Sequence, residues 1–196
     1  MRIIGNDPSV PRQTQEVASG TLPNGKPVVV NADGTVSAVS ATGGGAAFGT
    51  PVVFNDAESI YESATFDSNS NKVVISYRDS AAGDNGYAVV GTVSGSSISF
   101  GTPVAFNSGT GSTNYTAITF DSNSNKVVIA YQDGGNSSYG TAIVGTVSGD
   151  SISFGTEVVF NSGNSDFITS TFDSSNNKVV IAYRDQGNNQ YGTAVV

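Results

Sequence analysis

The chain has 196 residues, of which 37% are hydrophobic and only 12% are charged, and 8 Lys/Arg against 16 Asp/Glu leave a formal net charge of -8. An acidic surface of this kind repels a phosphate backbone, so we expect no nucleic-acid partner. The sequence contains no Cys and no His, which excludes disulfides, thiolate metal sites and imidazole bases, and we expect no metal and no cofactor.

The N-terminal region is predicted to form an extended arm over residues 1–19, because Pro8 and Pro11 interrupt it and no hydrophobic period is sustained. It contains no signal-peptide apolar segment, and no apolar run in the chain approaches the roughly 20 residues that span a bilayer. We therefore expect a soluble chain without membrane insertion or Sec-dependent export.

Residues 20–46 are predicted to form a small β-hairpin unit followed by a linker. Turn signals at Asn24-Gly25 and Asp33-Gly34 flank the apolar segment Val28–Val30, which is the pattern of a short hairpin. The glycine run Gly43–Gly45 then indicates the linker to the rest of the chain.

A repeated β unit dominates residues 47–196. The pattern Phe-Asp-Ser-x-x-x-x-Lys-Val-Val-Ile opens at Phe66, Phe120 and Phe172, at a spacing of about 53 residues. Abundant Gly, Ser, Thr, Val, Tyr and Phe favour short strands and tight turns. The three copies are placed near residues 56–107, 108–161 and 162–196.

Each copy is predicted to supply four antiparallel strands. In the first copy, the first strand ends at Asp67 and the second covers Lys72–Asp79. The third strand starts from Tyr87, and the fourth covers Ser97–Asn107 with a bulge or bend at Gly101. The alternation in the second strand places apolar or small side chains on both faces, as in a strand buried between two layers.

This pattern predicts an all-β fold, a β-propeller-like array of four-stranded antiparallel repeats. A linear stack of β repeats and a sandwich made of hairpins are the alternatives. Phe48–Asn55 has the sequence of a fourth strand without the three before it, whereas the last copy, through Tyr191–Val196, lacks its fourth strand. One option is that Phe48–Asn55 completes the last blade within one chain. Because three blades fall below the usual four to eight, we instead expect the chain to end inside a longer natural array, with two chains forming six blades as the alternative.

The segment Asp67–Asn71 matches the opening of a calcium-binding loop. The match then fails, because Lys72 replaces the loop glycine and Arg78 replaces the bidentate glutamate. A hairpin turn held by Asp and Asn side chains is therefore the preferred interpretation.

A Tyr-x-Asp pair ends the second strand of each copy, so the chain carries it three times. Ring faces and carboxylates are what a neutral sugar needs, through stacking and hydrogen bonds. A buried Tyr followed by a turn Asp is the preferred interpretation, because the Tyr continues the buried Val-Ile face and the Asp starts a loop. The candidate glycan contacts are Tyr77, Asp79, Tyr131, Asp133, Tyr183 and Asp185. Nothing in the sequence distinguishes two of the repeated carboxylates as a general acid and base, so we expect no enzymatic activity.

The opening MRIIGNDPSVPRQTQEVASGTLPNGKPVVVNADGTVSAV, followed by tandem FDSNSNKVVIAYRD, YGTAVVGTVSG and SISFGTPVVFN units, resembles virion structural and tail-fibre-like repeat proteins of tailed bacteriophages, notably marine phages that infect cyanobacteria. The resemblance covers essentially the whole chain. It implies a virion component, a tail fibre, appendage or decoration protein, in which the N-terminal segment docks on the particle and the β domain faces outward.

The resemblance also implies partners and a location. Other virion proteins, further copies of the chain and host-surface polysaccharide are the expected partners, and the protein would be assembled in the host cytoplasm and exposed on the particle surface. A free bacterial carbohydrate-binding or adhesion propeller is the first alternative, and a polysaccharide depolymerase is the second. The docking residues implied are Arg2, Ile3, Ile4, Val10 and Arg12.

Overall fold

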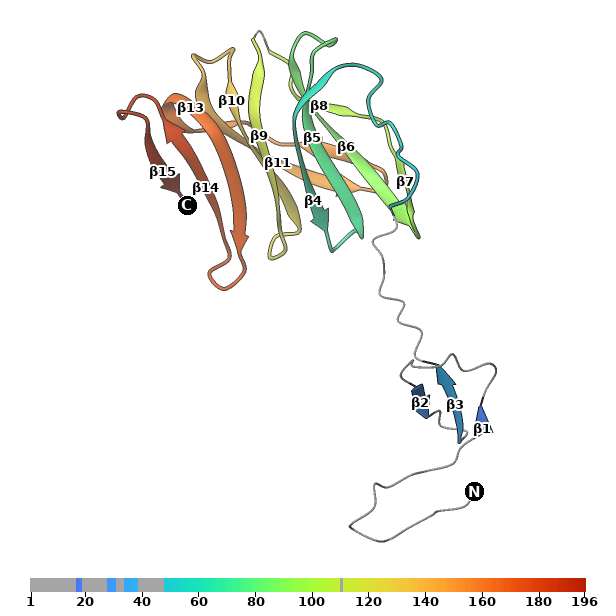
Figure 1. Cartoon of the computed structure of the whole chain (residues 1–196). Coiled ribbons are helices and arrows are strands. Elements are labelled where there is room, and N and C mark those ends of the chain that lie inside the picture. Colours follow the sequence, from blue (N-terminus) through green and yellow to red (C-terminus); the bar gives the residue numbers. More distant parts are fainter. Residues whose placement is uncertain (1–16, 19–27, 31–33, 39–47, 110) are drawn as a thin grey trace, which may run out of the picture. The chain divides into compact units, whose positions relative to one another are not determined.

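The computed structural model describes residues 17–18, 28–30, 34–38, 48–109 and 111–196. These residues form strands, turns and connecting segments and contain no helix, which confirms the predicted all-β class. The chain divides into two units, Met1–Phe48 and Gly49–Val196, coloured along the sequence in Figure 1.

The first unit contains a three-stranded sheet in the order β1-β3-β2. Strands β2 (Val28–Val30) and β3 (Thr35–Ala38) are antiparallel, as the predicted hairpin requires, and Gly34 adopts a φ of 78° in the turn before β3. Strand β1 (Val17–Ala18) pairs in parallel with β3, although these two residues fall within the predicted arm. The rest of that arm, with all five predicted docking residues, lies outside the described residues.

The first repeat forms one antiparallel sheet in the second unit. Two short strands share the outer edge of β6, one along each half, with a break in the pairing between them. At this break the Gly101 N–H donates to the Val90 carbonyl oxygen at 2.9 Å. The predicted bend at Gly101 is therefore confirmed. The strands are β4 (Ser59–Asp67), β5 (Lys72–Asp79), β6 (Asn85–Ser94), β7 (Ser97–Phe100) and β8 (Val104–Asn107).

The second and third repeats have the same strand order but share one long strand. The N-terminal part of β13 (Val158–Asp173) pairs with β11, whereas its C-terminal part pairs with β14, so both repeats join in one seven-stranded sheet. We call β9 to β12, together with β13 up to Asn164, the second sheet. We call the rest of β13, from Ser165, together with β14 and β15, the third sheet. The other strands are β9 (Thr113–Asp121), β10 (Lys126–Asp133), β11 (Tyr139–Ser148), β12 (Ser151–Phe154), β14 (Lys178–Asp185) and β15 (Tyr191–Val195).

Two buried apolar clusters lie between successive sheets. The first brings Val74 and Val90 of the first sheet together with Ile129 and Tyr131 of the second. The second cluster joins Ala130 of the second sheet to residues of the third. Because Ile129 and Ala130 face opposite clusters, β10 is buried on both faces, as its alternation predicts.

One aromatic contact recurs along the array. The ring centroids of Phe106 and Tyr131 lie 5.2 Å apart, and those of Phe160 and Tyr183 also lie 5.2 Å apart. Phe54 makes the corresponding contact with Tyr77 at 5.1 Å. Phe54 therefore covers part of the first sheet.

This contact excludes one of the options considered above. Among the described residues, Phe48–Asn55 forms no strand and does not complete the last sheet, because β15 pairs only with β14. The physical reason is visible in Figure 1, where this segment and β15 lie at opposite ends of the array.

Candidate functional site

Each repeat carries one β-bulge at the same place in its first strand. The pairing register shifts between Ile60 and Ser63 in the first repeat, and equivalent shifts occur in the other two. The bulged residues Tyr61, Tyr115 and Phe167 adopt φ angles of 61°, 52° and 50°. Left-handed backbone is unfavourable for aromatic residues, and β-bulges commonly redirect a side chain next to a binding site. We call these three residues the aromatic row.

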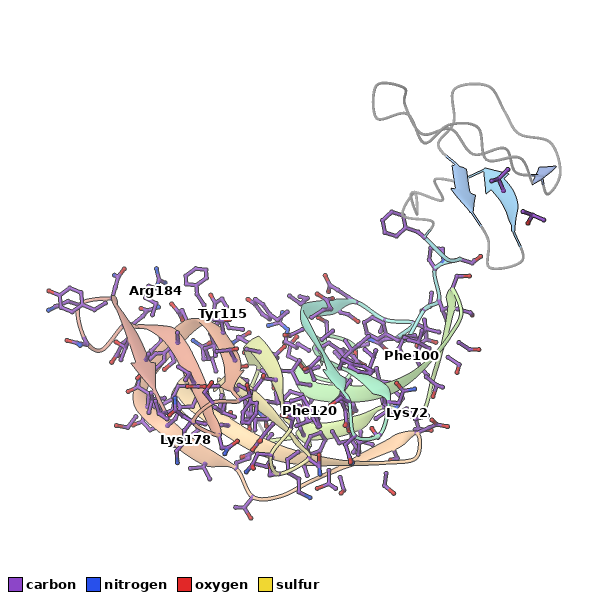
Figure 2. The ribbon with its side chains drawn as sticks, turned by 90° about the horizontal axis from the view of Figure 1, so that it is seen from below. Lys72, Phe100, Tyr115, Phe120, Lys178 and Arg184 are labelled. Carbon is purple, nitrogen blue, oxygen red and sulfur yellow. The ribbon has the colours of Figure 1, made fainter. Side chains whose placement is uncertain are left out.

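The rings of the aromatic row contact one another across the three repeats. The ring centroids of Tyr61 and Tyr115 lie 4.9 Å apart, and those of Tyr115 and Phe167 lie 5.2 Å apart. Arginines stack at both ends, with the Arg78 guanidinium 5.3 Å from the Tyr61 ring and that of Arg184 4.6 Å from the Phe167 ring. Phe167 remains 62% exposed, so the row offers an aromatic face to a ligand. Tyr115 and Arg184 lie near the same side of the array in Figure 2.

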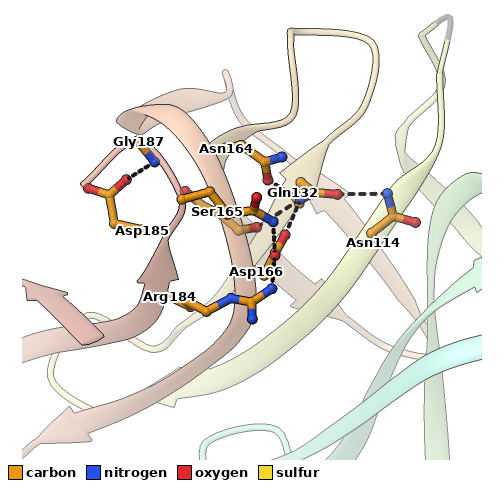
Figure 3. Close-up of polar contacts among 9 residues, drawn as sticks. Asn114, Gln132, Asn164, Ser165, Asp166, Arg184, Asp185 and Gly187 are labelled. Carbon is orange, nitrogen blue, oxygen red and sulfur yellow. Dashed lines mark hydrogen bonds and ion pairs between the residues drawn. The ribbon is translucent and has the colours of Figure 1, made fainter. Parts of the chain in front are cut away.

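A chain of hydrogen bonds runs beside the aromatic row. Arg78 Nη1 donates to Asn114 Oδ1 at 2.6 Å, and Asn114 Nδ2 donates to Gln132 Oε1 at 2.9 Å. Gln132 Nε2 then donates to Asp166 Oδ1 at 2.8 Å, and Arg184 Nη2 donates to Asp166 Oδ2 at 2.5 Å (Figure 3). The network therefore connects the two arginines that flank the row.

Asp166 is the anchor of this network. Its side chain is 5% exposed, and besides Gln132 and Arg184 it accepts a hydrogen bond from Gln186 Nε2. Burial and the nearby Asp166 carboxylate raise the pKa of Tyr115, so this ring of the row stays uncharged at neutral pH. A buried carboxylate with three donors fixes the position of Arg184 over Phe167.

A polar cleft of about 510 Å³ lies at the loops of the second repeat. Asn107, Asp133, Asn136 and Glu157 are among the residues that line it. Burial raises the pKa of the Tyr131 hydroxyl, and the interaction with the Glu157 carboxylate raises it further. Glu157 and Asp133 thus face one cavity.

The structure places the predicted Tyr-x-Asp residues in the core and in turns. Tyr77, Tyr131 and Tyr183 are buried, and each ring packs against a phenylalanine, so these rings are not available for stacking on a sugar. Burial, followed by the nearby Asp79 carboxylate, raises the pKa of Tyr77 to about 12.

The three aspartates of this series each hold the loop that follows them. Asp79 Oδ1 accepts the N–H of Ala81, and the equivalent oxygens of Asp133 and Asp185 accept the N–H of a glycine two residues later. Of the six candidate glycan contacts, Asp133 is the one that lines the polar cleft.

The calcium-like segment forms a hairpin turn. Asp67 Oδ1 accepts the N–H groups of Asn69 and Ser70, and Asn71 adopts a φ of 56°. Because the Asp67 carboxylate is occupied by its own turn, the preferred interpretation of this motif is confirmed. Among the described residues no group of three or more His, Cys, Asp or Glu is arranged to hold a metal ion.

The aromatic row and its arginines were absent from the sequence prediction. A signal for the row exists, because an aromatic residue stands five positions before Phe66, Phe120 and Phe172 in each copy. The bulge that turns these rings toward one another cannot be predicted from the alternation of apolar and polar residues.

Comparisons with protein-family models, with curated proteins and with solved structures give no match for this chain. The described residues contain no helix long and apolar enough to cross a bilayer.

Proposed function

We propose that this protein is a non-enzymatic glycan-binding β-repeat protein whose ligand lies along the aromatic row. The observation that carries the proposal is the recurrence of a left-handed aromatic bulge at Tyr61, Tyr115 and Phe167. Three unfavourable backbone conformations at equivalent positions are retained at a cost to stability, and such a cost is typical of binding sites.

The chemistry beside the row suits a neutral polysaccharide. Aromatic faces bury the apolar face of a sugar ring, while the Arg78 and Arg184 guanidinium groups over Tyr61 and Phe167 each carry several N–H donors of the kind that bond to hydroxyl groups. Rings contributed by successive repeats suit a ligand that is itself a repeating chain. The net charge of -8 disfavours polyanions such as acidic capsules.

The finer fold and the setting are parts of the same proposal. The three sheets are proposed as blades of a propeller-like array, supported by their common strand order and by first strands that lie side by side. The sequence resemblance supports a phage virion component that docks by its N-terminal segment and binds the host surface. When many copies are displayed on one particle, their weak individual contacts with the host surface add up through effective concentration. Detection of the chain in purified particles by mass spectrometry distinguishes this setting from a free bacterial adhesin.

The variant Phe167→Ala is expected to weaken binding to neutral polysaccharide about tenfold or more, because it removes an exposed ring from the row. A panel of immobilised neutral bacterial polysaccharides, probed with the full chain, gives the measurement. Phe167→Tyr should retain binding, since the other two repeats carry Tyr at this position.

The matched control is Phe48→Ala, which removes another exposed phenylalanine outside the row. Equal binding by wild type, Phe167→Ala and Phe48→Ala would refute the proposed role of the row.

A depolymerase is the second candidate, and the polar cleft is the observation that favours it. Asp133 and Glu157 face one cavity, and glycoside hydrolysis needs two carboxylates in one site. Asp133 Oδ1, however, accepts hydrogen bonds from the Gly135 N–H and Asn107 Nδ2, which ties it to loop structure. Release of reducing ends from a bound polysaccharide, lost in Glu157→Gln, would favour hydrolysis over binding alone.

A further inference from the structure

The polar cleft lies where one repeat departs from the pattern of the others. Glu157 is the third residue of the segment GTEVVFN, whereas the corresponding segments GTPVVFN and GTPVAFN carry Pro51 and Pro103 at this position. The connection that follows Asn107 is two residues longer than the one that follows Asn161. In repeat proteins, insertions in single repeats map to loops on one face, which is often the binding face. Both departures contribute to the lining of this one cavity.

The longer connection keeps the cleft open. At the junction of the second and third sheets, a Cβ at Gly163 would lie 3.3 Å from Asp185 Oδ1, so the loop is packed against this carboxylate. The equivalent glycine at the junction of the first and second sheets is Gly109. Among the described residues, a Cβ there would meet only Asn107 Oδ1, at 3.6 Å, and would not reach Asp133. The carboxylate of Asp133 is therefore separated from the loop that covers its equivalent in the next repeat.

The lining of the cleft is acidic and rich in hydrogen-bonding groups. Asp133 and Glu157 are its charged residues, and no Lys or Arg lines it. Asn107, Ser108 and Asn136 add amide and hydroxyl groups, which both donate and accept hydrogen bonds. The volume of about 510 Å³ lies within the roughly 300–1,000 Å³ of small-molecule sites.

Asp133 has one carboxylate oxygen without a donor. Its side chain belongs to a residue that is 9% exposed, and Oδ1 accepts hydrogen bonds from the Gly135 N–H at 3.0 Å and from Asn107 Nδ2 at 3.4 Å. Within the described part of the chain, Oδ2 has neither a hydrogen bond nor an ion pair. A buried carboxylate oxygen without a donor is costly, and Asp133 lines the cleft, so a ligand in the cleft could supply the donor.

Glu157 brings a second carboxylate to the same place. It is exposed and forms no ion pair with another described residue. Burial raises the pKa of the Tyr131 hydroxyl, and the carboxylates of Glu157 and Asp133 raise it further. Because both carboxylates act on this one hydroxyl group, a cation in the cleft would be attracted by both of them.

We propose that the polar cleft binds an amino sugar through its protonated amine. An ammonium group offers three N–H donors to the two carboxylates, while the amides of Asn107 and Asn136 suit the hydroxyl groups of the same sugar ring. A metal ion fits this lining less well, because no group of three or more His, Cys, Asp or Glu in the described residues is arranged to hold one. The site is separate from the aromatic row and does not depend on ligand binding there.

Glucosamine and glucose are the two probes that test this site on the full chain. Glucose has a hydroxyl group where glucosamine has its ammonium group, so the pair isolates the charge. We expect glucosamine to bind about tenfold or more tightly than glucose and to shift the backbone amide NMR signals of Gly109, Gly135 and Asn136. A monosaccharide contains no glycosidic bond, so binding is measured apart from hydrolysis. Equal affinity for the two sugars, or glucosamine shifts confined to residues outside the cleft, would overturn the proposal.

The variant Glu157→Gln is expected to weaken glucosamine binding about tenfold or more and to leave glucose binding unchanged, because it removes one of the two carboxylates. The matched control is Glu58→Gln, which removes the same charge from an exposed glutamate outside the cleft and should bind glucosamine as wild type does. Equal affinities of the two variants for glucosamine would contradict the role of Glu157.

The variant Phe167→Ala separates the cleft from the aromatic row. It should bind glucosamine as tightly as wild type, because Phe167 does not line the cleft. If Phe167→Ala lost glucosamine binding as Glu157→Gln is expected to, the amino sugar would lie at the row and the proposed site would be wrong.

Discussion

The variant Tyr131→Ala is expected to lower the free energy of unfolding by about 3–5 kcal/mol. Tyr131 is fully buried between the first two sheets, and its ring packs on Phe106 at 5.2 Å. Alanine would leave a cavity in the cluster that also contains Ile129 and Val74. The neighbouring strands are held in place by their pairing and do not move in to fill it. Chemical denaturation followed by circular dichroism measures the change.

The control for this variant is Tyr131→Phe. This variant keeps the buried ring and removes only the hydroxyl, which lies near Glu157, so the loss of stability should be about 1 kcal/mol or less. A loss below about 1 kcal/mol for Tyr131→Ala would mean that the first two sheets do not pack on each other through this ring.

The variant Asp166→Asn is expected to lower the free energy of unfolding by about 2–3 kcal/mol. An amide in this buried position would turn N–H groups toward the donors of Gln132, Arg184 and Gln186, and the Arg184 guanidinium would lose its ion pair at 2.5 Å. The expected loss lies below that of a fully buried pair because the Arg184 side chain is 37% exposed and can be solvated. Thermal and chemical denaturation give the value.

Asp84→Asn provides the matched comparison, since it removes the same charge from a more exposed pair. Asp84 Oδ1 lies 3.3 Å from Arg78 Nε, and the Asp84 side chain is 46% exposed, so we expect an effect below about 1 kcal/mol. Equal losses for the two variants would show that burial of Asp166 does not govern the network.

Regular alternation made much of the repeat predictable. The predicted strand Lys72–Asp79 coincides with β5, and the predicted fourth strand Ser97–Asn107 corresponds to β7 and β8 with a break at Gly101. In β5 the side chains alternate between two packed faces, and in β7 they alternate between an exposed and a half-buried face, so the sequence carries the period directly. The turn at Asp67 was predictable because its hydrogen bonds are local.

Features that depend on contacts between distant parts of the chain were not predicted from the sequence. The bulge at Tyr61, Tyr115 and Phe167 breaks the period of two, so the first strand was recognised only near its Phe-Asp end. The shared strand β13 was also missed. The connection from Phe106 to Thr113 is two residues longer than that from Phe160 to Ser165, and only the shorter one runs on as continuous strand.

The roles of the Tyr-x-Asp series were predictable in part. The series has the residue types of a sugar site, but the preferred interpretation as core and turn is confirmed, because its rings continue the buried face of the second strand. The exposed aromatic surface instead comes from three first strands that meet only in the folded array. A threefold repeat thus indicates that residues of several repeats form one surface, but it does not indicate which residues these are.

The most direct test of the central claim, that the aromatic row is the ligand-binding surface, is NMR of the full chain with labelled Phe and Tyr rings during titration with a neutral polysaccharide that the chain retains. The account predicts that the ring signals of Tyr61, Tyr115 and Phe167 shift together along one saturation curve. Saturable binding that leaves these three rings unshifted, with changes confined to residues around the polar cleft, would contradict it.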